Sequence, residues 1–333
     1  ERPRRGCFRI DLHARLQARP APVDLPRSAV SPAPLPSRPS ALRVWWAAIR
    51  PRTLGMAVAP VAVGAALAFA AAGRLDAAVL LATLACALLI QIGTNLYNDA
   101  VDFERGTDHP ERLGPLRVTL AGWASAAEVK RAALLCLLLA LVLGAWLCMV
   151  GGLPILAIGV ASLVAGWAYS GGPRPISHSP FGEFFVLLFF GVLAVVGSHW
   201  LQSRTTGVVD VIGGLAVGWP AAAVLLVNNF RDLDGDLRAG RRTLAARLGA
   251  QGVQRAYAAL VLFPLVAWLV IAAAGLPGAV LGLLGAPAVA SLIPRFRGAE
   301  GGAEFNAVLA DTARAGTRSA LMAAAGIILV SLL

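Results

Sequence analysis

The chain has 333 residues, of which 58% are hydrophobic and 14% are charged, and its mean hydropathy is +0.72. A water-soluble domain carries about 25% charged residues. The composition therefore excludes a soluble globular protein and indicates a polytopic membrane protein. The net charge of +11 does not indicate nucleic-acid binding, because residues 1–52 concentrate 11 arginines against three acidic residues. We expect the lipid bilayer as a partner, and no nucleic acid.

Residues 1–44 form a basic segment rich in Pro, Arg, Ala and Ser, without hydrophobic periodicity. This composition is typical of a disordered tail. The first apolar run comes only after this segment and is long enough to span a bilayer, so we expect a membrane helix there rather than a cleaved signal. The predicted domains are a disordered tail at 1–44 and a transmembrane domain at 45–333.

Nine apolar runs of spanning or near-spanning length follow the tail. Because lipid offers the backbone no hydrogen-bond partner, each run is expected to be a helix, and the fold class is all-α. The predicted runs are 53–72, 77–97, 132–150, 152–169, 181–201, 208–229, 256–275, 277–293 and 316–333. The prediction is weakest for the seventh and eighth runs, which are joined only by a short turn at Gly275 and Pro277.

Basic residues alternate between the connections. If the N-terminal tail is cytoplasmic, 16 Arg and Lys residues fall in inner connections, and only Arg74 and Arg204 fall in outer ones. This bias predicts a cytoplasmic N-terminus and an outer C-terminus. Half of the 18 acidic residues also lie on the inner side, in the connections after the second and the sixth helix.

Two acidic motifs occupy the inner ends of the second and sixth helices. Residues spaced by four and by seven or eight share one helix face. Each motif places one Asn and two Asp residues in this way: Asn95, Asp99 and Asp102 in the first, and Asn228, Asp232 and Asp236 in the second. The common Asn-xxx-Asp spacing indicates a weak internal repeat of two half-bundles.

Carboxylates gathered on one face repel each other unless a cation lies between them. Oxygen ligands without cysteine or paired histidine favour Mg²⁺, which usually completes its coordination shell with waters and phosphate oxygens. Two facing Asp clusters with arginines nearby therefore predict a diphosphate site, and the apolar helices around it suit a long hydrocarbon chain. The alternative is that these are solvated charges that only assist topology, although acidic residues contribute little to topology.

Asn98-Asp99-xx-Asp102 and Asp232-xxx-Asp236 resemble the two aspartate-rich motifs of the UbiA superfamily of intramembrane prenyltransferases. The resemblance covers nearly all of residues 45–333. Five stretches resemble the branch that prenylates 1,4-dihydroxy-2-naphthoate in menaquinone biosynthesis: RPRTL at 50–54, NLYNDAVDFERGTDHPERLGPLR at 95–117, YSGGPRP at 169–175, NNFRDLDGDLRAGRRTLAARLG at 228–249 and FNAVLADTAR at 305–314.

The resemblance implies a UbiA-type helical bundle in the cell membrane, with an active site that faces the cytoplasm. It implies transfer of a polyprenyl group from its diphosphate to the naphthoate, with release of diphosphate and CO₂ and formation of demethylmenaquinone. Mg²⁺ is the implied cofactor. The superfamily commonly has a third Asp in the first motif where this chain has Gly106, so Asp108 becomes a candidate ligand.

The candidate site residues follow from these motifs. We expect the metal ligands to be the carboxylates of Asp99, Asp102, Asp108, Asp232 and Asp236. We expect the diphosphate to be bound by amide, cationic and phenolic groups, namely Asn95, Asn98, Arg105, Tyr169, Arg174, Asn228 and Arg242. The expected catalytic carboxylates are Asp102, which stabilises the leaving group, and Asp99 or Asp234 as the base that takes the acceptor's hydroxyl proton.

Three further predictions concern residues outside the motifs. Arg50 and Arg52 are expected to bind the acceptor's carboxylate, unless both are only inner-side charges. Glu183 either pairs with Arg174 or forms a wall of the site. His178 and His199 are expected at opposite membrane faces as interfacial residues, where they cannot share a metal.

Two other functions stay open at this stage. Repeated halves with acidic residues also describe an ion-coupled transporter, although carriers keep such residues near the midplane of the bilayer and here they map to helix ends and loops. Within the enzyme class, another aromatic acceptor such as 4-hydroxybenzoate is the alternative.

Overall fold

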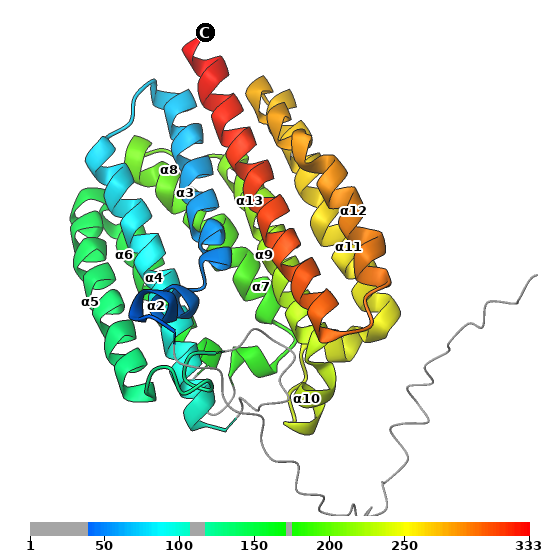
Figure 1. The fold of residues 1–333 in the computed structure, drawn as a ribbon. Coiled ribbons are helices and arrows are strands. Elements are labelled where there is room, and N and C mark those ends of the chain that lie inside the picture. The colour runs from blue at the N-terminus through cyan, green and yellow to red at the C-terminus, as the bar shows by residue number, and fades with distance from the viewer. Residues whose placement is uncertain (1–38, 107–116, 171–174) are drawn as a thin grey trace, which may run out of the picture. The chain divides into compact units, whose positions relative to one another are not determined.

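A computed structural model describes residues 39–106, 117–170 and 175–333, and the structural statements below refer to this part of the chain. Every regular element in it is a helix (Figure 1), which confirms the all-α prediction. Asp108 and Arg174, and most of the predicted tail, lie outside the described residues. Helix α2 (Ala41–Ile49) begins within the range predicted as tail.

Eight helical segments in the described part are long and apolar enough to span a membrane. They are α3 (Pro51–Ala72), α4 (Ala77–Glu104), α5 (Ala126–Gly151), the rod formed by α7 (Gly182–Val186), η2 (Leu187–Val192) and α8 (Leu193–Ser203), α9 (Val208–Arg231), α11 (Leu244–Ala273), the rod formed by η3 (Pro277–Gly285) and α12 (Ala286–Arg297), and α13 (Gly302–Leu332).

The fourth predicted run, at 152–169, corresponds to α6 (Leu153–Ser170), a shorter apolar helix, so nine spans remain a prediction. The two runs for which the prediction is weakest, at 256–293, are present as two segments that are each long enough to span. Two short elements, η1 (Ile176–His178) and α10 (Leu233–Arg238), lie between spans. The chain is thus a multi-pass membrane protein.

Local sequence signals set the helix ends. The side chain of Asp76 accepts a hydrogen bond from the backbone N–H of Val79 and caps the start of α4. Ser125 and Glu128 form a reciprocal capping box at the start of α5. These caps satisfy N–H groups that the first turn of a helix leaves without partners. Gly73 ends α3 in the left-handed conformation, with a φ of 69°, which a glycine adopts without steric cost.

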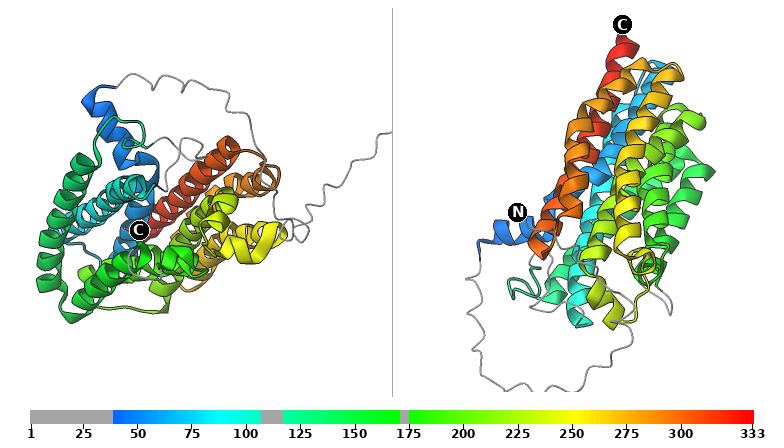
Figure 2. Two further views of the ribbon diagram at one scale, coloured as in Figure 1. Left: turned by 90° about the horizontal axis from the view of Figure 1, so that it is seen from below. Right: turned by 90° about the vertical axis from the view of Figure 1, so that its right-hand side faces the viewer.

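Helices α3 and α9 form the centre of the bundle. In their most apolar windows 56% of residues are buried within the protein, against 17% in α4 and α5. The largest core cluster joins side chains of α3, α9, α11 and α13, with the indole of Trp268 fully buried among them. Figure 2 shows α5 at one edge of the bundle. The outer faces of α4 and α5 therefore remain apolar and exposed, as expected for lipid-facing helices.

Glycines bring the α7–η2–α8 rod against α9. A Cβ on Gly191 would lie 2.4 Å from the carbonyl oxygen of Gly214 and 2.7 Å from the Cα of Gly218. Both obstacles are backbone atoms, so the side chain could not be accommodated without moving the helices. Close contact through small residues is a common way to pack helices in membranes.

Substitution Gly191→Ala is expected to lower stability by about 1–3 kcal/mol, because the added methyl group overpacks a backbone contact. Its thermal unfolding midpoint in detergent should fall. Gly159→Ala is the matched control, since no atom lies within 4 Å of the position of its Cβ. Equal midpoints for the two variants would contradict this account of the contact between η2 and α9.

Candidate active site

The two acidic motifs lie at the same end of the bundle. The C-terminal part of α4 carries the first motif, and the end of α9 with α10 carries the second; both helix ends are at the bottom of Figure 1. Segment η1 lies between the two motifs. Burial lowers the pKa of His178, and the positive charges of Arg241 and Arg105 lower it further, so cations near both motifs act on the same imidazole.

Asp99 is the buried anchor of the first motif. Its residue is 1% exposed, and its carboxylate accepts hydrogen bonds from the backbone N–H groups of Val118 and Thr119, both at 3.3 Å, and from the Thr119 hydroxyl. These bonds fasten the segment that follows residue 116 to the end of α4. Carboxylates that accept several bonds of this kind fix local structure.

Asp102 lies one turn further along α4 and is more accessible, with a side chain that is 31% exposed. Its Oδ2 lies 2.7 Å from Nη1 of Arg117, which also donates to the backbone carbonyl of Asn98. Arg117 is itself largely buried. Thus Asp99 and Asp102 both face the segment at 117–119, as the shared helix face predicted, but only Asp102 is partly open to solvent.

The side-chain amide of Asn95, the first residue of this motif, already bonds other protein groups. Its side-chain amide donates to the carbonyl oxygen of Ile49 and to the hydroxyl of Thr53, each at 3.1 Å. It therefore ties α4 to the corner between α2 and α3. Arg50 forms this corner in the left-handed conformation, with a φ of 55°, and Arg52 lies exposed in the first turn of α3.

The second motif is organised around Arg231, the last residue of α9. The Arg231 side chain is 1% exposed and its guanidinium donates to three oxygen groups. It bonds Asn228 Oδ1 at 2.8 Å, both oxygens of Asp232 at 2.6 and 2.8 Å, and Asn306 Oδ1 on α13 at 2.6 Å. A planar guanidinium can hold several oxygens in a fixed arrangement. Arg231 therefore orients the polar groups of the motif and links them to α13.

Asp236 belongs to a separate short helix, because α9 ends at Arg231 and α10 begins at Leu233. The backbone N–H of Asp236 still bonds the carbonyl oxygen of Asp232 at 2.9 Å, so the two aspartates remain one turn apart. Burial raises the pKa of Asp236, while Arg241, whose Nη1 lies 3.3 Å from Oδ1, opposes the increase. Asp234, in the first turn of α10, is exposed.

Tyr169 and Glu183 lie beside the second motif. Glu183 is buried at the start of α7, and its Oε1 accepts a hydrogen bond of 2.9 Å from the side-chain amide of Asn229 on α9. Glu183, Arg241 and Asp236 are the charged groups that act on the Tyr169 hydroxyl. Two further predicted diphosphate ligands, Arg105 and Arg242, are exposed at this end, and the backbone N–H of Arg242 bonds the carbonyl oxygen of His178.

Sequence reasoning overlooked the residues that organise both motifs. Three arginines each bond a motif aspartate, although the sequence pattern indicates them only as inner-side charges: Arg117, Arg231 and Arg241. Asn306 was noted only as part of a family-like stretch, although it binds Arg231. The available signal was that both arginines of the second motif lie within five residues of a motif aspartate.

The donor set suits a hard cation that is shared with phosphate. Among the described residues no three His, Cys, Asp or Glu side chains form a ready-made metal cluster. Mg²⁺ needs only one or two carboxylates when waters and substrate phosphates supply its other ligands. The partly open Asp102 and Asp232 and the nearby Asp236 match that requirement, whereas both Asp99 oxygens already accept hydrogen bonds.

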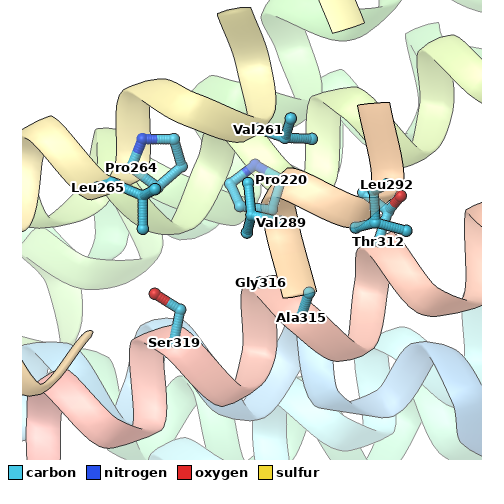
Figure 3. Close-up of a pocket in the computed structure, with 10 residues that line it drawn as sticks. All are labelled: Pro220, Val261, Pro264, Leu265, Val289, Leu292, Thr312, Ala315, Gly316 and Ser319. Carbon is cyan, nitrogen blue, oxygen red and sulfur yellow. The ribbon is translucent and has the colours of Figure 1, made fainter. Parts of the chain in front are cut away.

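Two other features do not belong to this site. His199 is buried within the protein, and its Nδ1 pairs with Asp210 near the opposite end of the bundle, so its position at a membrane interface stays a prediction. A small crevice between α9, α11, α12 and α13 (Figure 3) is lined mainly by apolar side chains around Pro220 and Pro264. Its hydroxyls, Thr312 and Ser319, already bond other protein groups, so it lacks free polar groups for a ligand.

Comparison with known proteins places this chain in a known enzyme family. The model of the UbiA prenyltransferase family matches residues 57–310, which include both motifs. The chain belongs to the UbiA prenyltransferase family. It is therefore an enzyme, and the transporter alternative falls away.

The chain is similar in sequence to curated relatives over most of its length. It is 36% identical over 271 residues to the 1,4-dihydroxy-2-naphthoate octaprenyltransferase of Mycobacterium tuberculosis, covering 80% of this chain and 91% of that protein. It is 39% identical over 233 residues to the Escherichia coli protein of the same name, covering 68% and 75%. Among solved structures, a UbiA homolog from Archaeoglobus fulgidus bound to GPP and Mg²⁺ superposes with a TM-score of 0.61 at 16% identity, over 86% of this chain and 99% of that one. The latter likeness supports the fold.

Substitutions Asp99→Ala and Asp102→Ala are expected to have different effects on stability. Asp99→Ala leaves buried N–H groups without acceptors, which costs about 1–3 kcal/mol for each group. Asp102→Ala leaves Arg117 its hydrogen bond to the carbonyl of Asn98, and the carboxylate that is lost is itself partly exposed, so the decrease should be smaller. The measurement is the thermal unfolding midpoint in detergent without added metal, and a larger decrease for Asp102→Ala would contradict the assigned roles.

Substitution Arg231→Lys is expected to weaken metal binding by about 10- to 100-fold, because lysine keeps the charge but cannot hold Asn228, Asp232 and Asn306 together. The measurement is the Mg²⁺ concentration that gives half-maximal prenyl transfer. Arg238→Lys, at an exposed position on α10, is the matched control. An unchanged Mg²⁺ requirement in Arg231→Lys would show that Arg231 does not position the motif.

Proposed function

We propose that this protein transfers a polyprenyl group from polyprenyl diphosphate to 1,4-dihydroxy-2-naphthoate, with release of diphosphate and CO₂, and so forms demethylmenaquinone. The observation that carries the proposal is the similarity, over most of the chain, to proteins named 1,4-dihydroxy-2-naphthoate octaprenyltransferase. The arrangement of both acidic motifs at one end of an apolar bundle supports it, because an amphipathic diphosphate needs both environments.

The diphosphate is proposed to bind between the two motifs. Asp102, Asp232 and Asp236 would hold Mg²⁺, with Asp108 as a further candidate and Asp99 chiefly a structural anchor. When bound, Mg²⁺ would supply Lewis-acid stabilisation of the negative charge that develops on the leaving diphosphate. Arg117 and Arg241 already lie against the motif carboxylates and are placed to donate to phosphate oxygens as well.

The protein's own residues would also direct the allylic carbon to the ring rather than to water. The apolar helices around the motifs offer the prenyl chain a medium that excludes water, which preserves a reactive carbocation-like species. Arg50 and Arg52 at the start of α3 are proposed to bind the carboxylate of the acceptor, because a helix N-terminus and two guanidinium groups favour an anion there.

The proposed location is the cell membrane, with the N-terminus and the active site on the cytoplasmic side. The distribution of basic residues supports this orientation, because five arginines adjoin the helix ends that carry the motifs: Arg105, Arg117, Arg231, Arg241 and Arg242.

The protein reconstituted in lipid vesicles is expected to convert labelled geranylgeranyl diphosphate and 1,4-dihydroxy-2-naphthoate into a decarboxylated naphthol lipid, and a chelator of divalent metals should abolish the product. Asp102→Ala and Asp236→Ala should each lower the rate by about 10²-fold or more, because each removes a ligand of the charge-stabilising metal. Glu300→Gln, at an exposed position near α13, is the control.

The acceptor is tested in the same assay with 4-hydroxybenzoate. Label only in the hydroxybenzoate product would overturn the proposed acceptor and leave the prenyltransferase assignment intact. Undiminished product in the presence of chelator would overturn the proposed metal dependence.

A further inference from the structure

The carboxyl group of Glu183 is buried beside the second motif with half of its hydrogen-bonding capacity unused. The residue is 5% exposed. Oε1 accepts the hydrogen bond from Asn229, but Oε2 is buried and has no hydrogen-bond partner in the described part of the chain. Buried polar atoms are nearly always bonded, and an exception costs about 1–3 kcal/mol. Such an atom beside a substrate site is a candidate for contact with the substrate.

Glu183 contacts a different side of α9 from the side that carries the proposed cation-binding network. Asn228 and Asn229 are successive residues, so their side chains leave the helix about 100° apart. Asn228 bonds Arg231 and so belongs to the network that holds Asp232, whereas Asn229 bonds Glu183. The carboxyl group therefore borders the same motif without being part of its cation-binding network.

The Tyr169 hydroxyl lies close to the start of α7, next to Glu183. A Cβ on Gly182, the residue before Glu183, would lie 3.9 Å from that hydroxyl oxygen. Glu183 on α7 acts electrostatically on this hydroxyl, as do Arg241 and Asp236, which follow α9. No ion pair to Glu183 is present among the described residues, so its carboxyl group is not held by a neighbouring cation there.

We propose that Glu183 is the base that takes the hydroxyl proton of the aromatic acceptor and later returns it. This inference rests on the proposed function. The O–H bond breaks and its proton passes to Oε2; the ring carbon that carries the carboxylate then forms a bond to C1 of the prenyl group while the C1–O bond to diphosphate breaks. Loss of CO₂ returns the electron pair of its C–C bond to the ring, and Glu183 gives the proton back to the oxygen.

This proton cycle is balanced without any further reactant. The acceptor carboxylate and the prenyl diphosphate carry the same total charge as the diphosphate product, because the quinol and CO₂ are neutral. No proton is therefore released overall, and a buried group that holds one proton for part of the cycle is sufficient. A buried carboxyl group suits this role because it has no bulk water with which to exchange the proton.

The two bases expected from sequence are less suited to this role. Asp99 uses both oxygens to bind the segment at 117–119, and Asp234 is exposed on α10. Asp102, Asp232 and Asp236 each pair with an arginine and are the proposed metal ligands.

The test compares wild type, Glu183→Gln, Glu183→Asp and the control Glu300→Gln in the reconstituted assay, across the pH range in which the acceptor's hydroxyl titrates in water. Glutamine keeps the size and the bond to Asn229 but cannot take a proton. We expect Glu183→Gln to lower kcat by about 10²- to 10⁴-fold at neutral pH. Its rate should then rise about tenfold for each pH unit, because the acceptor arrives already deprotonated. Glu183→Asp should retain an intermediate rate with the pH profile of the wild type.

Two results would overturn the proposal. They are a Glu183→Gln rate equal to that of the wild type, and a decrease of the same size at every pH, which a purely structural role would produce. Binding of geranylgeranyl diphosphate with Mg²⁺, measured separately, should be unchanged in Glu183→Gln, and its loss would also overturn the assignment. If the wild type itself forms no naphthol lipid, the proposed function fails instead, so the two failures are distinguishable.

Discussion

Carboxylates at the end of an apolar bundle need neighbouring groups that compensate their charge, and the end of this bundle that carries the acidic motifs is arranged around that requirement. Arg117 pairs with Asp102, Arg231 with Asp232 and Arg241 with Asp236. Removing a charge from water costs several kcal/mol unless an opposite charge or hydrogen bonds compensate. Arg117 and Arg231, which are buried, and the half-buried Arg241 therefore restrict where the acidic side chains can lie.

The same requirement separates two kinds of aspartate that look alike in the sequence. Asp99 and Asp102 belong to one motif and one helix face, yet the first is enclosed by the backbone at Val118 and Thr119 while the second remains partly open. The buried one holds the segment at 117–119 against α4, and the open one remains accessible from solvent. Within this motif, Asp99 therefore stabilises the fold, while Asp102 remains accessible.

The second motif is connected to more of the bundle than the first. Through Arg231 it reaches Asn306 on α13, and through Asn229 it reaches Glu183 on α7. Because α9 is also among the most buried helices, the motif at its end is held from several sides. This arrangement provides a rigid set of oxygen and nitrogen groups, which is what stabilisation of a leaving group requires.

The sequence by itself determined the membrane class, the helical fold, the two acidic motifs and the family, because hydropathy, the need to satisfy the backbone in lipid and the motif spacing are local properties. It also predicted that Asp99 and Asp102 share a face, since helix periodicity is local too. Only the tertiary structure decided that Arg117, Arg231 and Arg241 partner the aspartates, that Asn306 joins them from α13, and that His199 is buried with Asp210. It also showed that α9 ends at Arg231, before Asp236. Contacts such as Arg231 with Asn306 join residues far apart in the chain, and their geometry depends on how whole helices pack, which no local pattern encodes.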